Sequence, residues 1–186
     1  MGKYDVLILF SGGADSRLLI EIAKSLEKGI YCLMIDYGQL HRDELESAKK
    51  QLSDLGLGYN QVTVSGLNIE SALTGKGIKG QYEGVNSYNV PGRNTLFLSI
   101  AFSIAEANDI PEIWYGPDMS DFFGKFPDCY QAYVGKINEL FEIAGSKKIK
   151  VVAPLLGYSK EMVLETLDKQ YGIAKETLYS GYGEWA

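Results

Sequence analysis

Apolar residues recur along the chain with two different periods, and these periods predict its strands and helices. Short apolar runs indicate buried strands at residues 4–10, 30–35, 61–64, 112–115 and 149–153. After the first run, apolar residues return at helical spacing, as Leu18, Leu19, Ile22 and Leu26 do before the stop at Lys28-Gly29. Further helices are predicted over residues 41–55, 96–105, 128–144 and 159–169.

The alternation of strands and helices predicts an α/β fold, a parallel sheet with helices on both faces. We expect the 186 residues to form a single domain, since this length supports one full core. Ligands bind such sheets beyond the carboxyl ends of their strands. Polar segments stand at these places, at residues 11–16, 36–41 and 116–118, and from Pro154 onward. The functional site is therefore expected at this edge of the sheet.

Residues 65–91 are rich in Gly, Ser and Asn and show little periodicity. Loops of this length within a compact domain are usually functional, so we expect a long loop or lid. It contains Gly75-Lys-Gly77-Ile-Lys-Gly80, which matches the spacing of the dinucleotide-binding fingerprint. This match neither follows a strand directly nor opens an apolar helix, so we interpret it as a loop segment.

The composition narrows the class of protein. Hydrophobic residues make up 46% and charged residues 23%, as in ordinary globular domains. No apolar stretch of about 18 residues occurs, so no membrane span is expected. The first residues lead directly into a predicted strand, so we expect no signal peptide, and Cys32 and Cys129 have no paired spacing; both points favour a cytoplasmic protein. The net charge of −6 argues against a nucleic-acid partner.

The turn after the first strand carries the strongest chemical signal. Ser11-Gly-Gly-Ala-Asp-Ser16 lies between an apolar strand and a helix, where backbone N–H groups and the helix dipole favour an anion. Gly12 and Gly13 allow close approach, and Ser11 and Ser16 add hydroxyl groups. A carboxylate at Asp15 requires a cation between itself and phosphate, so the turn predicts a polyphosphate with a divalent metal ion. It is no Walker A loop; it resembles the loop of the N-type ATP pyrophosphatases.

Two cations at predicted helix starts are candidate ligands for phosphate or carboxylate. Arg93 follows Pro91-Gly92, where a guanidinium would clamp such an anion in bidentate fashion. The alternative is a surface arginine beside a capping Asn94. Lys160 opens the last helix, either to reach a phosphate or as a surface lysine.

Three carboxylates and one imidazole complete the candidates. Asp118, Asp121 and Asp128 lie in a segment with several phenylalanines, and a carboxylate cluster near phosphate suits Mg²⁺. The alternative is a polar loop with aromatic anchors. His41 is the only histidine, and its spacing alone makes it a surface residue.

Taken together, these segments resemble one family, the 7-cyano-7-deazaguanine synthases of the queuosine precursor pathway. The resemblance runs in family order from residue 8 to about residue 161. The matching pieces are Ser11-Gly-Gly-Ala-Asp-Ser16, Asp36-Tyr-Gly-Gln-Leu-His41 with Glu44, Val90-Pro-Gly-Arg-Asn94 with Leu98-Ser99, Gly116 with Asp118, Phe126-Pro-Asp-Cys129, Pro154-Leu155 and Ser159-Lys160.

The resemblance implies an adenine nucleotide alpha hydrolase-like fold and an ATP-dependent carbon–nitrogen ligase. Its substrates would be 7-carboxy-7-deazaguanine, ammonia and ATP with Mg²⁺, and an adenylated intermediate would lead to the 7-cyano base. ATP and the metal ion would bind at Ser11, Gly12, Gly13, Asp15, Ser16 and Gly116. The catalytic residues would be Asp15, Ser16, Arg93 and Lys160. The substrate would contact Gln39, His41, Arg93, Asp118 and Asp128. The resemblance also suggests a homodimer.

The tail departs from the family pattern. Members usually carry four C-terminal cysteines that bind zinc, whereas Ser180-Gly181-Tyr182 stands at the place of the first one and the others have no counterpart. No zinc site is therefore expected. Tyr130 stands where the family usually has an arginine. The alternatives are an amide-forming relative that stops at 7-amido-7-deazaguanine, another ATP pyrophosphatase of this loop type, and a nucleotide-binding module without catalysis.

Overall fold

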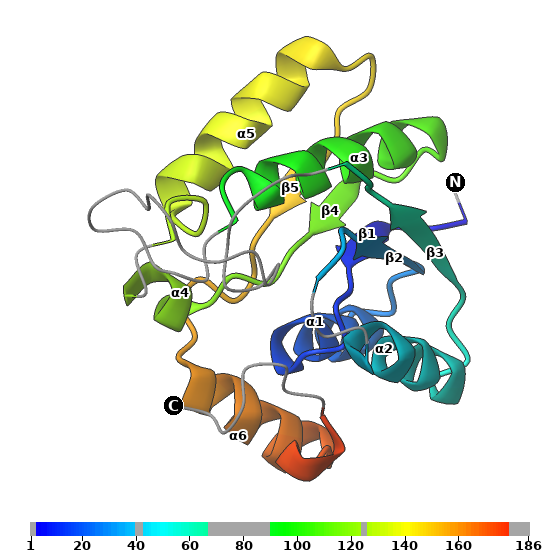
Figure 1. Ribbon diagram of the computed structural model, residues 1–186, viewed down its shortest axis with the longest axis vertical. Helices are drawn as coiled ribbons and strands as arrows, with labels where there is room; N and C mark the ends of the chain where they lie inside the picture. The colour runs from blue at the N-terminus through cyan, green and yellow to red at the C-terminus, as the bar shows by residue number, and fades with distance from the viewer. Residues whose placement is uncertain (1–2, 40–42, 67–89, 124–125, 179–186) are drawn as a thin grey trace.

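The computed structural model describes residues 3–39, 43–66, 90–123 and 126–178. Strands and helices alternate along the chain (Figure 1). In chain order they are β1 (Val6–Leu9), α1 (Ala14–Ser25), β2 (Ile30–Asp36), α2 (Asp43–Asp54), β3 (Tyr59–Thr63), α3 (Arg93–Ala107), β4 (Glu112–Trp114), α4 (Met119–Phe123), α5 (Gln131–Ala144), β5 (Lys150–Val152), α6 (Lys160–Tyr171) and the short 3₁₀ helix η2 (Lys175–Thr177).

The described strands form one five-stranded sheet in the order β3-β2-β1-β4-β5, and every neighbouring pair is parallel. β1 is central, and its Val6 lies opposite Ile30 of β2 on one side and Glu112 of β4 on the other. The parallel sheet and its crossover helices confirm the α/β fold predicted from the sequence.

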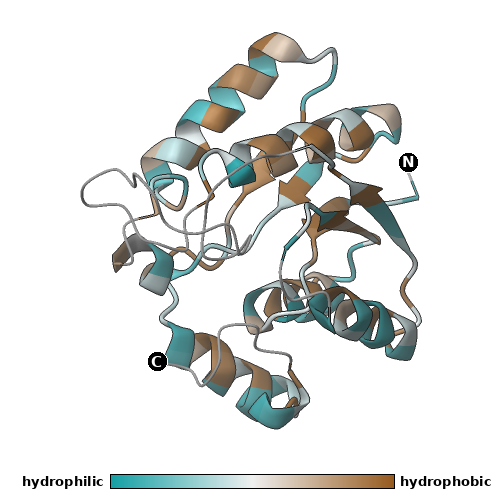
Figure 2. Ribbon diagram, in the orientation of Figure 1, coloured by the Kyte–Doolittle hydropathy of each residue, from teal (hydrophilic) through white to brown (hydrophobic). Residues whose placement is uncertain are grey.

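Two hydrophobic cores lie on opposite faces of the sheet. α1, α2 and α6 cover one face, and α3 and α5 cover the other (Figure 1). Successive residues of β1 alternate between the cores: Ile8 belongs to the first and Leu7 to the second, as the strand period requires. Figure 2 shows much brown on the inner strands of the sheet, while much of the edge strand β3 and of α2 is teal. A strand buried on both faces explains why residues 6–10 are continuously apolar.

Several element boundaries differ from those predicted. α3 begins at Arg93, before the apolar periodicity starts, because Gly92 caps the helix in the left-handed region (φ 69°) and the first turn is polar. α5 begins at Gln131 instead of residue 128, since the chain turns between Phe126 and Cys129. α4 and η2 were not predicted. Most of the expected loop, residues 67–89, lies outside the described residues and includes Gly75 to Gly80.

Side chains tie the two short strands β4 and β5 to their surroundings. Trp114 is buried, and its Nε1 donates to Glu112 Oε2 at 2.9 Å. Lys28 Nζ pairs with the same oxygen at 3.0 Å and lies 5.7 Å from the centre of the indole ring. On β5, Asn138 Nδ2 donates to Val151 O at 2.9 Å, and Asn138 Oδ1 accepts from Val151 N at 2.8 Å.

The strand order places a topological switch point between β1 and β4. From β1 the chain passes to α1 on one face, and from β4 it leads to α5 on the other (Figure 1). Segments that diverge in this way leave space for a ligand beyond the carboxyl ends of the strands. The segments from which the sequence predicts a site follow the carboxyl ends of β1, β2, β4 and β5.

Candidate functional site

The turn after β1 forms a compact loop at the N-terminus of α1. Gly12 has a φ of 86°, a conformation that favours glycine, and Gly13 is the N-cap of α1. Ser16 Oγ donates to Gly13 O at 3.0 Å and accepts from Ser11 N at 3.3 Å. Gly13 offers no side chain to cap the helix. Backbone N–H groups of the first turn of α1 are thus available to an anion.

α2 packs against this loop and forms a hydrogen bond with it. A Cβ atom added to Gly12 would lie 2.9 Å from the Cβ of Ala48, so the loop and α2 are in close contact. Gln51 Nε2 donates to the carbonyl oxygen of Gly12 at 2.8 Å. The sequence reasoning missed both α2 residues. The available signal was the apolar stripe of α2, on which Gln51 is a polar residue next to Ala48 and Leu52.

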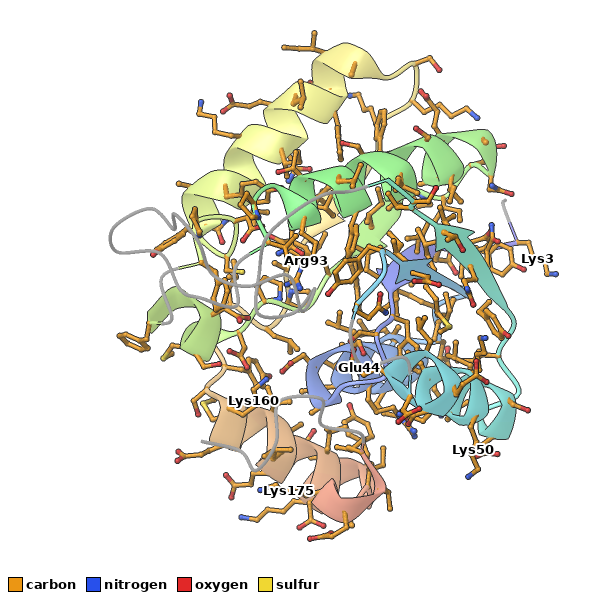
Figure 3. The ribbon with its side chains drawn as sticks, viewed as in Figure 1. Lys3, Glu44, Lys50, Arg93, Lys160 and Lys175 are labelled. Atoms are coloured by element: carbon orange, nitrogen blue, oxygen red, sulfur yellow. The ribbon has the colours of Figure 1, made fainter. Side chains whose placement is uncertain are left out.

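Lys160 lies at the start of α6 (Figure 3). It forms ion pairs with two carboxylates that follow different strands. Its Nζ lies 2.8 and 2.7 Å from the two carboxylate oxygens of Asp15 and 2.8 Å from Asp118 Oδ2. Gly116 permits this approach, because a Cβ atom there would lie 3.2 Å from the Cβ of Asp15. The structure therefore brings together four residues that the sequence predicted for the site, three of them charged.

Burial and charge pairing shift the pKa values of these groups in different directions. Burial raises the pKa of Asp15 from 3.8 to about 6, although Lys160 opposes the shift. Burial alone would also raise the pKa of Asp118, but hydrogen bonds from Lys160 and Ser120 hold it below its usual value. Burial would lower the pKa of Lys160, and the two carboxylates outweigh burial and raise it. Lys160 is thus cationic at neutral pH.

Asp118 also caps α4. Its Oδ1 accepts hydrogen bonds from Ser120 N at 2.7 Å and Asp121 N at 3.3 Å, and Asp121 Oδ2 accepts from Asp118 N at 2.9 Å. This reciprocal pattern is a capping box with Asp in place of Glu. The side chain of Asp118 is 0% exposed. One carboxylate oxygen of Asp118 thus binds the first turn of α4, and the other binds Lys160.

Arg93 lies at the start of α3 against the loop that follows β2 (Figure 3). Its Nη1 donates to the hydroxyl of Tyr37 at 3.2 Å, and its guanidinium carbon lies 5.8 Å from the centre of that ring. Gln39 is buried, and its Oε1 accepts from Tyr37 N at 3.1 Å. Tyr37, which the sequence reasoning left unassigned, thus joins two of the predicted residues.

Asp128 and His41 are the remaining residues that the sequence predicted for the site. The backbone oxygen of Asp128 accepts from the hydroxyl of Tyr115 at 3.2 Å, and its carboxylate lies 3.7 Å from the thiol of Cys129. Asn94 Nδ2 lies 3.9 Å from the same thiol, which links this segment to the start of α3. His41 lies outside the described residues.

Within the described part of the chain, no group of three or more His, Cys, Asp and Glu side chains has the arrangement of a metal site. None of the helices described there is long and apolar enough to cross a membrane. The expected zinc-free tail, from residue 179 onward, lies outside the described residues.

Comparison with known proteins identifies close sequence relatives. The sequence model of the family described as queuosine biosynthesis protein QueC matches residues 5–185. A 7-cyano-7-deazaguanine synthase from Prochlorococcus marinus strain MIT 9312 is 36% identical over 191 residues, which cover 95% of this chain and 84% of the relative. One from Pseudomonas putida is 34% identical over 192 residues, which cover 97% and 82%.

Solved structures share the fold at lower identity. A protein from Methanocaldococcus jannaschii, described as a predicted subunit of tRNA methyltransferase, superposes with a TM-score of 0.57 at 22% identity, over 86% of this chain and 71% of that one. The NH₃-dependent NAD synthetase from Campylobacter jejuni superposes with a TM-score of 0.56 at 14% identity, over 97% and 70%. At these identities the likeness concerns the fold alone.

Proposed function

The chain belongs to the family of the queuosine biosynthesis protein QueC and is an enzyme of that kind, and we propose that it converts 7-carboxy-7-deazaguanine, ammonia and ATP into 7-cyano-7-deazaguanine. The observation that supports this most strongly is the convergence at the switch point. There the loop before α1, the Asp15–Lys160 ion pair and Arg93 from α3 gather around the carboxyl ends of the strands. The loop suits the phosphates of ATP, and the two cations suit phosphate or a substrate carboxylate.

The loop at residues 11–16 would bind the β and γ phosphates of ATP. N–H groups at the start of α1, together with its dipole, favour the negative charge that grows on pyrophosphate as it leaves. Asp15 fits Mg²⁺, because its side chain is 25% exposed beside the loop and carboxylate and phosphate oxygens are the ligands that this ion prefers. When bound, the ion would neutralise phosphate charge.

The reaction needs the same displacement at phosphorus twice. A substrate carboxylate oxygen attacks the α phosphorus, the bond to the β-phosphate oxygen breaks, and pyrophosphate leaves. Ammonia then adds to the acyl carbon and loses a proton, and AMP departs with one carboxylate oxygen, which leaves the amide. The amide oxygen attacks a further ATP, and loss of both N–H protons with AMP gives the nitrile. Both substrate oxygens thus finish in AMP.

Positioning and charge neutralisation would be the main contributions of the chain. Arg93 would hold the carboxylate or the α phosphate through its planar guanidinium. Lys160 would supply positive charge beside the loop, since its raised pKa keeps it protonated. Gln39, His41 and Asp128 remain proposed contacts for the deazaguanine base.

Isotope labelling tests the proposal. The full chain is incubated with ATP, Mg²⁺, heavy-nitrogen ammonium and substrate whose carboxylate carries heavy oxygen, and the products are weighed by mass spectrometry. We expect a nitrile with heavy nitrogen and AMP with heavy oxygen. ADP without AMP would contradict adenylation. Amide alone would limit the chain to the first half of the reaction, and bound ATP without turnover would favour a different ATP pyrophosphatase or a nucleotide-binding module.

A matched pair of lysines provides the control. Lys160→Met removes the ammonium that contacts Asp15 and Asp118, and we expect it to abolish nitrile formation. Lys136→Met removes an exposed ammonium on α5 whose described partner is Glu139, and we expect it to retain activity. Equal activity of the two variants would remove Lys160 from the proposed site.

A further inference from the structure

Gln51 is a polar side chain on the buried face of α2. It is 9% exposed, and the other buried residues of the helix are Leu45, Ala48 and Leu52. Its Nε2 donates a 2.8 Å hydrogen bond to the carbonyl oxygen of Gly12. Its Oε1 is buried and accepts no hydrogen bond within the described residues. An unsatisfied buried acceptor is unfavourable, so packing alone does not explain an amide at this position.

The contact between α2 and the loop is too close for another residue at Gly12. The φ of 86° is a conformation that side chains rarely adopt, and an added Cβ atom would lie 2.9 Å from the Cβ of Ala48. Ala48 is fully buried, which leaves the loop backbone no space to move toward α2. The Gln51 amide therefore meets the Gly12 carbonyl oxygen at a fixed place.

The peptide unit between Gly12 and Gly13 is planar, so the direction of the Gly12 carbonyl oxygen also sets the direction of the Gly13 N–H. The carbonyl oxygen of Gly12 and the N–H of Gly13 point in opposite directions, because they belong to one trans peptide unit. With the oxygen held against α2, the Gly13 N–H points away from α2. It donates a long 3.4 Å bond to the exposed hydroxyl of Ser11, a partner that an anion can readily replace.

We propose that Gln51 is a positioning residue of the phosphate loop, which locks the peptide between Gly12 and Gly13 with its N–H directed to the pyrophosphate end of ATP. Two adjacent glycines give this peptide little resistance to turning over. A turned peptide would present the Gly12 carbonyl oxygen to the phosphates and repel them. The inference rests on the ATP-dependent function proposed above and adds α2 to the phosphate site.

Gln51→Met tests this role, because it keeps the length of the side chain and removes both amide atoms. The loss of a satisfied donor and the loss of an unsatisfied acceptor act on stability in opposite directions. We therefore expect the thermal midpoint to move by less than about 4 °C. Binding of inorganic pyrophosphate, measured by calorimetry, should weaken roughly tenfold or more, the usual effect of losing an oriented donor to a charged ligand.

Asn138→Leu is the matched control, since Asn138 is another side-chain amide that bonds backbone atoms, here those of Val151 in β5. It should change stability and leave pyrophosphate affinity within about twofold. In steady-state assays Gln51→Met should raise the KM for ATP and leave the KM for the deazaguanine carboxylate unchanged, a selectivity that a general loss of structure would not produce. Gln51→Glu, which keeps the size but replaces the amide donor with a negatively charged oxygen, should weaken pyrophosphate binding as well.

The outcomes separate this inference from the proposed function. Unchanged pyrophosphate affinity in Gln51→Met, or an equal loss in Asn138→Leu, would overturn the role of Gln51 alone. A collapse of the thermal midpoint in both Gln51 variants would also overturn it, because the amide would then serve stability. Pyrophosphate binding that depends on Gln51 in a chain that turns over no deazaguanine would uphold this inference and refute the proposed function. Failure of the natural chain to bind pyrophosphate would overturn both.

Discussion

Replacing Asp15 with asparagine should stabilise the fold at neutral pH while abolishing activity. Asparagine has the shape of the neutral carboxyl group and carries no charge into the site. The pKa of Asp15 is raised from 3.8 to about 6 in the folded chain, chiefly by burial. Ionisation of this carboxyl therefore costs more in the folded chain than in the unfolded one. The variant avoids that cost and lacks the carboxylate proposed to face ATP and Mg²⁺.

The size of the expected stabilisation follows from the shift in the pKa of Asp15. A rise of about 2 pKa units corresponds to about 3 kcal/mol at neutral pH. A quarter of the Asp15 side chain meets solvent, which screens the effect, so we halve it to about 1.5 kcal/mol. For a chain of this length, such a gain raises the midpoint of thermal unfolding by roughly 3–6 °C.

The direction of the stability difference between Asp15→Asn and the natural chain can be checked by changing the pH. A group with a raised folded pKa contributes stability below its unfolded pKa and loses it as the pH rises through the folded value. The advantage of Asp15→Asn should thus be complete above about pH 7 and shrink to about a third at pH 4.5. Urea unfolding of both proteins without Mg²⁺ at these pH values measures it. Equal or lower stability of the variant at pH 7.5 would refute the reasoning.

Glu165→Gln provides a control of opposite sign. The carboxylate of Glu165 accepts a hydrogen bond from Lys169 on the surface of α6, and this contact holds its pKa below the usual value. Its replacement should give no stabilisation at neutral pH. A similar gain in both variants would mean that removal of any negative charge from this acidic chain stabilises it.

Three further substitutions test the site. Gly12→Ala introduces a Cβ atom 2.9 Å from Ala48 and a strained φ of 86°, so urea unfolding should show a loss of roughly 2 kcal/mol, which Ala48→Gly should partly restore. Lys160→Met leaves Asp118 Oδ2 buried without its cation and should cost about 2 kcal/mol at pH 7.5 by the same assay. Arg93→Lys keeps the charge and loses the planar fork, so kcat/KM should fall at least about tenfold while the thermal midpoint stays unchanged.

The sequence predicted the sheet edge at which the candidate residues gather, because carboxyl ends of parallel strands meet at one edge whatever the strand order. It did not reveal which residues would touch. Asp15 and Lys160 are 145 positions apart, and their contact depends on α6 packing beside α1. Spacing along the chain contains no information on that packing.

The residues that the sequence reasoning missed or assigned differently are those whose role depends on contacts across the fold. Gln51 was visible as a polar residue on an apolar stripe, yet its partner Gly12 lies 39 positions away. Asp118 and Asp121 have the spacing of a capping box, but α4 is too short to show a periodic pattern. A capping role for Asp118 therefore became apparent only with the backbone of α4.

Trp114 gives this molecule an optical probe of its own. The chain contains two tryptophans, and this one is buried on β4, two residues before Gly116 at the switch point. Its indole N–H is bonded to the carboxylate of Glu112, and an ammonium lies beside the ring. In a Trp185→Phe variant, the emission of Trp114 alone would report the electrostatic surroundings of the strand that leads into the site. Unfolding and ligand binding can then be followed without a label.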